Sequence, residues 1–329
     1  MKLIIQIPCY NEYQTLGLTL AQLPRTLAGF DTVEWLVIDD GSNDDTVGAA
    51  RQAGVDHIIS HKRNAGLARA FMTGLQESIR LGADVIVNTD GDNQYCADDI
   101  PALVGPILAG NAEIVVGARP IDGIEHFSLV KKLLQKAGSW MVRVLSRTTV
   151  ADATSGFRAM SRSAARRLMV FSKYTYTLET LIQAGLKNMA VLSVPVRVNP
   201  ILRPSRLISS IPVYVFKSVA TIIRILVIYR PFRFFASVGL MLFFLGLLPG
   251  VRFLYFYVTG DGAGHVQSLI LAAILLGMGF QMFLVAFIAD LLASNRVLLE
   301  DIRLAATERE HRSEERRVGK EGRSRGAPD

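Results

Sequence analysis

Two long uncharged segments near the C-terminus constrain this chain of 329 residues more than any other feature. Residues 234–251 and 266–289 contain no Asp, Glu, Lys or Arg. A helix needs about 20 apolar residues to cross the ~30 Å hydrocarbon core of a bilayer, and each segment is close to that length. A soluble core of this size does not need two such segments in succession. We therefore expect two transmembrane helices within residues 232–290, joined by a polar loop at 259–265.

Most of the arginines that flank these two segments lie on one side of them. Arg224, Arg230 and Arg233 precede the first segment, Arg296 and Arg303 follow the second, and the loop between them has no Lys or Arg. Basic flanks stay on the cytoplasmic side of a membrane. The N-terminal apolar stretch is too short for a signal peptide and no small-residue cleavage site follows it. We expect an inner (cytoplasmic) membrane protein whose N-terminal domain and both termini are cytosolic.

Before these segments, short apolar β-rich runs alternate with amphipathic helical ones, which is typical of an α/β domain with a largely parallel sheet. We expect strands at residues 3–7, 35–38, 57–59, 85–88, 114–116 and 190–194. Helices are expected at residues 13–27, 45–53, 67–81, 99–108, 129–145 and 178–184. The sequence thus divides into a cytosolic domain at 1–208, amphipathic interface helices at 209–231, the two spans at 232–290, and a cytosolic segment at 291–311.

The last stretch, residues 312–329, contains the peptide RSEERRVGKE, which a common sequencing adapter encodes. We therefore predict that this tail is not native to the protein. A genuine disordered basic tail is the alternative. The protein is basic in either case, with 36 Lys and Arg against 29 Asp and Glu. The two cysteines, Cys9 and Cys96, have no metal-binding or disulfide spacing and are expected to be small buried side chains.

Polar residues follow three of the expected strands, where ligands bind in parallel sheets. Glu12 follows the first strand, and Asp39 and Asp40 follow the second. Asp90 and Asp92 follow the fourth strand, and such hard oxygen ligands suit Mg²⁺ or Mn²⁺. Each motif alone has a structural alternative, because Asp-Gly-Ser is a common turn and paired aspartates arise by chance. Their combination, each just after a strand, favours a nucleotide and metal site.

The order of these motifs resembles the family 2 glycosyltransferases of the GT-A fold. The resemblance covers about residues 1–230, and with the two C-terminal spans it resembles the branch of dolichyl-phosphate mannose synthases and bacterial polyprenyl-phosphate glycosyltransferases. It rests on Pro8 to Glu12, Asp39 to Ser42, Asn64 to Ala70, Asp90 to Asp92, Gly117 to Arg119, Asp152 to Arg158 and Arg203 to Arg206.

The resemblance implies a role for each matching residue. Around the nucleotide-sugar it places Pro8, Tyr10, Glu12, Asp39, Asp40 and Asp90. Around the divalent cation, Mg²⁺ or Mn²⁺, it places Asp90, Asp92 and Gln94. Near the sugar and the acceptor phosphate it places the catalytic candidates Arg119, Asp152 and Arg158, which act with Asp92. Against phosphates, on a loop that closes over the site, it places Arg203, Ser205 and Arg206. Gly91 stands where many relatives have alanine, which we expect to loosen this turn.

The chemistry supports these roles independently. Negative charge grows on the departing diphosphate, and a divalent cation stabilises it. A phosphate monoester acceptor has a second pKa near ~6, so it is largely ionised at neutral pH and needs no strong base. Asp152 can then orient the acceptor instead of deprotonating it. Arginine pairs would bring the anionic acceptor beside the anionic donor.

Two other functions stay open. One is a processive polysaccharide synthase, although the Gln-x-x-Arg-Trp motif and the larger set of spans of that class are not found. The other is a catalytically silent membrane scaffold, against which the intact Asp40, Asp90, Asp92 and Arg203 argue. We expect a UDP- or GDP-linked sugar, a polyprenyl phosphate and the bilayer as partners, and no nucleic acid. Self-association through the spans also stays open.

Overall fold

The computed structural model describes residues 1–120, 143, 150–170, 176–200, 220, 223–224 and 226–324, with side chains up to residue 299 and at 302. The chain divides into two compact units, Met1–Ser218 and Val219–Asp329. This division falls within residues 209–231, which we expected to form interface helices between the cytosolic domain and the two spans. The expected helix at 129–145 lies outside the described residues except for Arg143.

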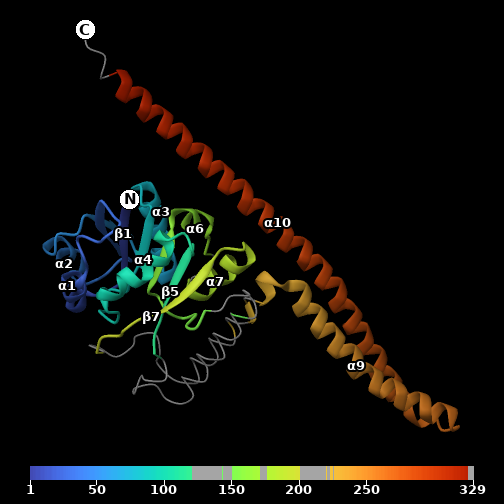
Figure 1. Cartoon of the computed structure of the whole chain (residues 1–329). Coiled ribbons are helices and arrows are strands. Elements are labelled where there is room, and N and C mark those ends of the chain that lie inside the picture. The colour runs from blue at the N-terminus through green and yellow to red at the C-terminus, as the bar shows by residue number, and fades with distance from the viewer. Residues whose placement is uncertain are drawn as a thin grey trace. The chain divides into compact units, whose positions relative to one another are not determined.

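The first unit is built on a seven-stranded sheet with the order β3-β2-β1-β4-β6-β5-β7 (Figure 1). Its strands are β1 (Lys2–Cys9), β2 (Thr32–Asp39), β3 (His57–Ser60), β4 (Val85–Asn88), β5 (Ile114–Ala118), β6 (Arg158–Ser161) and β7 (Val191–Pro195). All pairs are parallel except those of β6, which runs antiparallel to both of its neighbours. The predicted α/β class with a largely parallel sheet is confirmed, and the sequence analysis missed β6.

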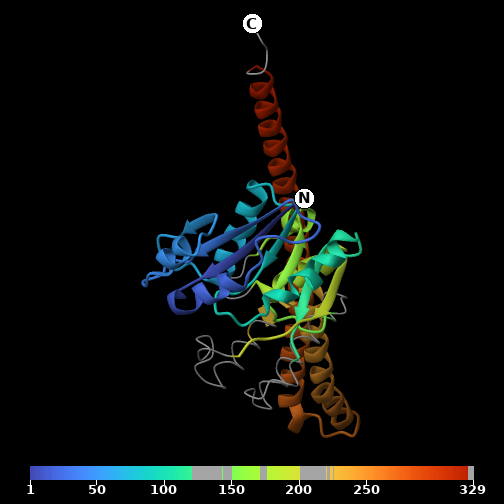
Figure 2. The ribbon, with the colours of Figure 1, turned by 60° about the vertical axis from the view of Figure 1, so that its left-hand side comes forward.

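Helices cover both faces of this sheet (Figure 2). They are α1 (Tyr13–Gln22), α2 (Thr46–Gln52), α3 (Leu67–Arg80), α4 (Ile100–Leu108), α6 (Arg162–Arg167) and α7 (Thr177–Leu186), with a 3₁₀ turn η1 (Ala97–Asp99) before α4. The prediction for α1 was too long by five residues. Leu23 precedes Pro24 and has an extended ψ of 137°. A residue before proline is disfavoured in the α-region, so the helix ends there.

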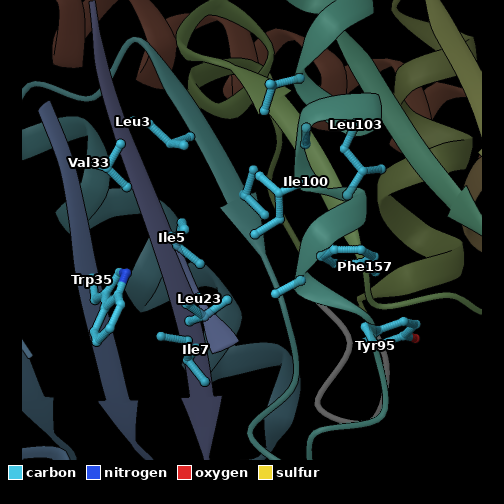
Figure 3. Close-up of a cluster of buried hydrophobic side chains, with 14 of the residues drawn as sticks. Leu3, Ile5, Ile7, Leu23, Val33, Trp35, Tyr95, Ile100, Leu103 and Phe157 are labelled. Atoms are coloured by element: carbon cyan, nitrogen blue, oxygen red, sulfur yellow. The ribbon is translucent and has the colours of Figure 1, made fainter. Parts of the chain in front are cut away.

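Alternate residues of β1 point to opposite faces of the sheet. Figure 3 shows Leu3, Ile5 and Ile7 in a row along β1, with Val33 and Trp35 beside them on β2. These side chains belong to one buried apolar cluster that includes residues of α1 and α4. Each fully buried aliphatic side chain of this kind contributes about 1.5–3 kcal/mol. The continuous apolar run of β1 is therefore explained by its central place between two covered faces.

The antiparallel strand β6 brings a distant turn to the ligand-binding edge. Asn88, the last residue of β4, pairs with Arg158, the first residue of β6. Since the strands run in opposite directions, the turn at residues 152–157 arrives at the edge where β1, β2 and β4 end. Residues far apart in the sequence meet there.

The second unit is a pair of helices, α9 (Pro231–Val258) and α10 (Val266–Ser324), that run side by side (Figures 1 and 2). Small residues line their contact: Gly239 on α9 and, at seven-residue spacing on α10, the buried Ala272, Gly279 and buried Ala286. By length and composition, Pro231–Val258 and Ala263–Leu299 can each cross a membrane. The two predicted apolar helices are thus present. The backbone of α10 continues to Ser324, within the tail at 312–329 that we predict is not native.

We predict that a larger side chain at Gly279 will force α9 and α10 apart. A Cβ at Gly279 would lie 3.0 Å from the Gly239 carbonyl oxygen, and backbone cannot rotate away as a side chain can. Gly277→Val is the matched control, because a Cβ there meets nothing within 4 Å. Disulfide formation between cysteines placed at Phe232 and Phe287, whose rings are 5.3 Å apart, reports the contact. Gly279→Val should slow the formation of this disulfide severalfold. Equal rates of disulfide formation in Gly279→Val and Gly277→Val would contradict the prediction.

Candidate active site

The loops that follow β1 and β2 are held together by hydrogen bonds. The Asn11 N–H donates to Ser42 Oγ (2.9 Å), and the Asn43 N–H donates back to Asn11 Oδ1 (2.8 Å). Pro8 is buried within β1, whereas Tyr10 at the tip of the first loop is 37% exposed. The backbone is therefore fixed while the Tyr10 ring remains accessible to a ligand. A hollow of about 340 Å³ lies beside this loop, lined by residues 11–15, 43 and 44.

Asp39 and Asp40 are both buried, and their carboxylates accept hydrogen bonds from backbone N–H groups of nearby loops. The Asp39 carboxylate accepts from the Ser42 N–H at 3.0 Å. The two oxygens of Asp40 accept from the backbone N–H groups of residues 65 and 66, at 2.9 and 2.8 Å. His61 Nδ1 lies 2.7 Å from Asp40 Oδ1. Asp40 thus shapes the loop between β3 and α3, and His61, to which the sequence analysis gave no role, is its partner.

Glu12 lies between the first loop and the aspartate turn after β4. Its N–H donates to Thr46 Oγ1 (2.9 Å), and its carboxylate is 2.9 Å from Thr15 Oγ1. The charge of Glu12 also acts to raise the pKa of Asp90. The structure thus places Glu12 close to the aspartate turn, whereas the resemblance assigned it to the nucleoside.

Asp90 and Asp92 follow β4 and are held in a tight turn. Burial, and next the charge of Asp92, raise the pKa of Asp90 to about 7, against the opposing effect of Arg119. The main chain of Gln94 supports the turn, since its N–H donates to Asp92 Oδ1 at 3.1 Å. The expectation that Gly91 loosens this turn is wrong, because a Cβ at Gly91 would lie only 2.8 Å from Cys9 Sγ. The turn packs closely against β1.

These residues fit a divalent cation. Two carboxylates lie together, partly desolvated, and each disfavours the charge of the other, so that a cation between them would relieve the repulsion. Their oxygens are the hard ligands that Mg²⁺ and Mn²⁺ prefer. Within the described ranges, no group of three or more His, Cys, Asp or Glu side chains is arranged to hold a metal. The remaining ligands would have to come from water and from a bound phosphate-containing molecule.

Asp152 forms a buried ion pair with Arg119. Arg119 Nε donates to Asp152 Oδ2 (2.7 Å) and its Nη2 lies 3.2 Å from Oδ1, so the pair is bidentate. Thr154 adds hydrogen bonds from its N–H and hydroxyl to the same carboxylate. Burial acts to raise the pKa of Asp152, but Arg119 and Thr154 outweigh it and hold that pKa below its ordinary value. Asp152 is therefore a poor proton acceptor.

Arg158 is almost completely buried, at 1% exposure, and its three guanidinium nitrogens are all engaged. Nε donates to Ser155 O (2.8 Å), Nη2 to Ala153 O (2.9 Å) and Nη1 to Thr180 Oγ1 (2.6 Å). In this structure Arg158 therefore supports the 152–156 turn from within the protein. It does not present its donors to an acceptor phosphate, as the resemblance implied.

Asn199, which the sequence analysis missed, ties a later segment to the aspartate turn. Its N–H donates to Gln94 O (2.8 Å), and its side-chain amide donates to Asn93 O (3.1 Å) and Tyr95 O (3.2 Å). An Asn outside any motif gives no sequence signal of this kind. The predicted phosphate-binding residues Arg203, Ser205 and Arg206 follow a few positions later and lie outside the described residues.

The structure thus brings Asp90, Asp92, Arg119 and Asp152 to one edge of the sheet, since each of these charges contributes to the pKa of a neighbour. Burial acts to lower the pKa of Arg119, but Tyr95, Asp152 and Asp90 outweigh it and raise that pKa. Two carboxylates that can share a cation lie beside an ion pair that is already neutralised. The site can therefore stabilise a departing anion.

Two curated proteins with named activities are similar to this chain. The chain is 29% identical over 212 residues to a UDP-N-acetylglucosamine–dolichyl-phosphate N-acetylglucosaminyltransferase of Methanococcus voltae, covering 58% of this chain and 83% of that protein. It is 27% identical over 207 residues to an undecaprenyl-phosphate mannosyltransferase of Micrococcus luteus, covering 60% and 83%.

Among solved structures, glucosyl-3-phosphoglycerate synthase of Mycobacterium tuberculosis, in a complex with Mn²⁺, UDP-glucose and phosphoglyceric acid, has the same fold. The TM-score is 0.52 at 21% identity, over 67% of this chain and 79% of that one. The family model described as glycosyl transferase family 2 matches residues 4–169, which is half of the chain. The chain therefore belongs to glycosyl transferase family 2.

Proposed function

We propose that this protein transfers a sugar, with inversion, from a UDP- or GDP-linked donor to a polyprenyl phosphate of the undecaprenyl or dolichyl type. The reaction takes place at the cytoplasmic face of the membrane and supplies a lipid-linked sugar donor. One observation carries the choice of acceptor: the carboxylate best placed to serve as a base, Asp152, is buried in a bidentate ion pair with Arg119.

The acceptor chemistry follows from that ion pair. A sugar hydroxyl must lose a proton to become a nucleophile, and a base for this step works best with a pKa near the operating pH. Asp152 has the opposite property, because Arg119 and Thr154 lower its pKa. A phosphate monoester, with its second pKa near ~6, already carries the negative charge it needs. Asp152 then keeps Arg119 and the adjacent turn in place.

On the donor side, Asp90 and Asp92 would hold the divalent cation, Mg²⁺ or Mn²⁺, with Gln94 supporting Asp92. When bound, the cation supplies positive charge to the diphosphate as it departs. The bond from the anomeric carbon to the donor diphosphate breaks, and its electron pair stays on the diphosphate. The bond from that carbon to the acceptor phosphate oxygen forms on the opposite face, which inverts the centre. No acid is required of the protein.

Pro8, Tyr10 and Asp39 are proposed to contact the nucleoside, with Asp40 shaping the neighbouring loop. Arg119 faces the sugar or the acceptor, and Arg203, Ser205 and Arg206 bind phosphate. Arginine suits this task because its planar guanidinium makes two parallel hydrogen bonds to one phosphate. Arg158 acts indirectly, through the turn that carries Asp152.

A membrane location is supported by α9 and α10. Arg233 and Arg252 are 19 positions apart on α9, a rise of about 28 Å at 1.5 Å per residue that matches the hydrocarbon thickness. Between them lie large exposed apolar side chains such as Phe244 and Leu248. Arg296, near the C-terminal end of the apolar part of α10, donates a hydrogen bond to Tyr229 Oη at 3.2 Å. The basic flanks support cytosolic termini.

The named activities of the relatives support a lipid phosphate acceptor. A direct test incubates membranes containing the protein with polyprenyl phosphate, Mn²⁺ or Mg²⁺ and a panel of UDP- and GDP-sugars, and identifies products by mass spectrometry. We expect one sugar per polyprenyl phosphate. A polymeric product would favour a processive synthase, and turnover of no donor would favour a silent scaffold.

We predict that Asp92→Asn will fold and stay in the membrane fraction but lose at least about 100-fold in turnover. The substitution keeps the shape of the side chain and removes the charge that holds the cation. Asp98→Asn is the matched control, because the Asp98 side chain is 80% exposed on the neighbouring turn. Wild-type turnover that persists in excess chelator would overturn the metal assignment.

We predict that Asp152→Asn will cost far less turnover than Asp92→Asn, within about tenfold, whereas loss of a true general base costs ~10²–10⁴-fold. Both variants are compared by kcat at saturating donor and acceptor, with donor and lipid binding measured separately. Abolished turnover in Asp152→Asn with normal binding of both substrates would make Asp152 the base.

The pH profile provides a second measurement. The pKa of Asp152 is lowered from its ordinary value of 3.8. The ionised Asp152 therefore stabilises the fold at any pH above 3.8, and this stabilisation is lost only as the pH falls through the lower pKa of the folded protein. Asp152 stays ionised between pH 5 and 8 as a result. The pKa of Asp90, raised to about 7, falls in the same range, so the profile is recorded at saturating Mn²⁺, which would keep Asp90 ionised. Under that condition a fall in turnover below pH ~6 reports the second proton of the acceptor phosphate.

A further inference from the structure

Gly91, between the two aspartates, is a glycine for reasons of space. Its φ lies outside the left-handed region, so the backbone conformation does not require glycine. A Cβ at this position would lie 2.8 Å from Cys9 Sγ and 3.5 Å from Glu12 Cγ. The first distance is closer than real Cβ atoms approach a neighbour, so either the sulfur or the turn would have to move.

The sulfur of Cys9 is not free to move. Cys9 is the last residue of the central strand β1, is 3% exposed, and pairs with Asp39 on β2. Its Sγ lies 3.4 Å from Ile7 O, within reach of a thiol hydrogen bond. Burial, and next the charge of Glu12, raise the pKa of this thiol well above its ordinary value, so it stays uncharged beside the carboxylates.

The turn itself is held from the side of α1. Thr15 Oγ1 and Thr19 Oγ1, one helical turn apart and both buried, lie 3.0 and 3.2 Å from the Gly91 carbonyl oxygen. A displacement of the turn away from Cys9 would therefore change these hydrogen bonds as well. Asp90 and Asp92 are the immediate neighbours of Gly91, so any such displacement moves both carboxylates.

We propose that the Cys9 sulfur and the missing side chain of Gly91 form a size-matched pair that sets the separation of the Asp90 and Asp92 carboxylates. Cys9 and Gly91 are then positioning residues for the divalent cation, and this inference rests on the proposed function only in assigning that cation to the donor site. Residues that orient metal ligands typically change metal affinity by about 10–100-fold when replaced. The effect of the pair should appear in cation binding before it appears in folding.

The test is a four-way comparison of the full-length protein in detergent: wild type, Gly91→Ala, Cys9→Ala, and the double variant. Binding of Mn²⁺ is followed by the electron paramagnetic resonance signal of the free ion, with the same nucleoside diphosphate, UDP or GDP, in every titration. We expect Gly91→Ala to raise the half-saturating Mn²⁺ concentration at least about tenfold. Adding Cys9→Ala should restore it to within about threefold of wild type, because the new methyl group then has room.

Two matched controls separate this pair from general effects. Gly17→Ala adds the same methyl group on α1, where nothing lies within 4 Å of it. Cys96→Ala removes the other free cysteine, which is partly exposed. Both should bind Mn²⁺ as wild type does. Thermal unfolding of every variant shows whether a weakened titration reflects misfolding.

Three results would overturn the inference: wild-type Mn²⁺ binding in Gly91→Ala, no recovery in the double variant, or no Mn²⁺ binding by the wild type. If Gly91→Ala alone does not fold, the double variant tests the inference, which then requires that the double variant folds and binds Mn²⁺. The titration contains no lipid acceptor. A wild type that binds Mn²⁺ and nucleotide but glycosylates no polyprenyl phosphate would refute the proposed function and leave this inference standing.

Discussion

The side chain of Asn88 connects the parts of the catalytic unit on which the site depends. It is fully buried at the end of β4, where its amide Nδ2 donates to Gly156 O (2.8 Å) and lies 2.9 Å from Tyr176 Oη. Its Oδ1 accepts from Gln6 Nε2 of β1 at 2.8 Å. Each such group, left without a partner in the core, costs about 1–3 kcal/mol. One amide thus fixes the aspartate turn, the 152–156 turn and the central strand in a single arrangement.

That arrangement gathers buried charges that are only partly compensated. Arg119 is paired with Asp152, while Asp90 and Asp92 keep an excess of negative charge that burial makes costly. In the proposed function, a nucleotide-sugar bound with its cation would neutralise this charge where the diphosphate departs.

Much of the fold could be predicted because its signals are local. The apolar runs of β1, β2 and β4 and the helices between them follow from composition and periodicity within a few residues of each boundary. Strand β6 could not be predicted, because it has four residues, begins with Arg158 and owes its place to pairing with β4 and β5. The end of α1 was missed although Pro24 marks it.

The candidate site likewise contains residues that could be predicted from the sequence and residues that could not. Motif residues such as Asp90 and Asp92 could be identified from their types and their position after a strand. The roles of His61, Asn199 and Cys9 depend on distances between segments tens of residues apart, which no local pattern encodes. Arg158 shows the converse: its motif suggested contact with a ligand, and its burial shows that it supports the protein instead.

The close contact between Gly239 and Gly279 would have a consequence in a bilayer whose thickness differs from the length of the two helices. Two helices packed on small residues at seven-residue spacing cannot slide past each other without bringing larger side chains into contact. Hydrophobic mismatch with the bilayer is commonly relieved by tilt. A hairpin of fixed register would tilt as one body, so that the depths of its two ends in the bilayer change together.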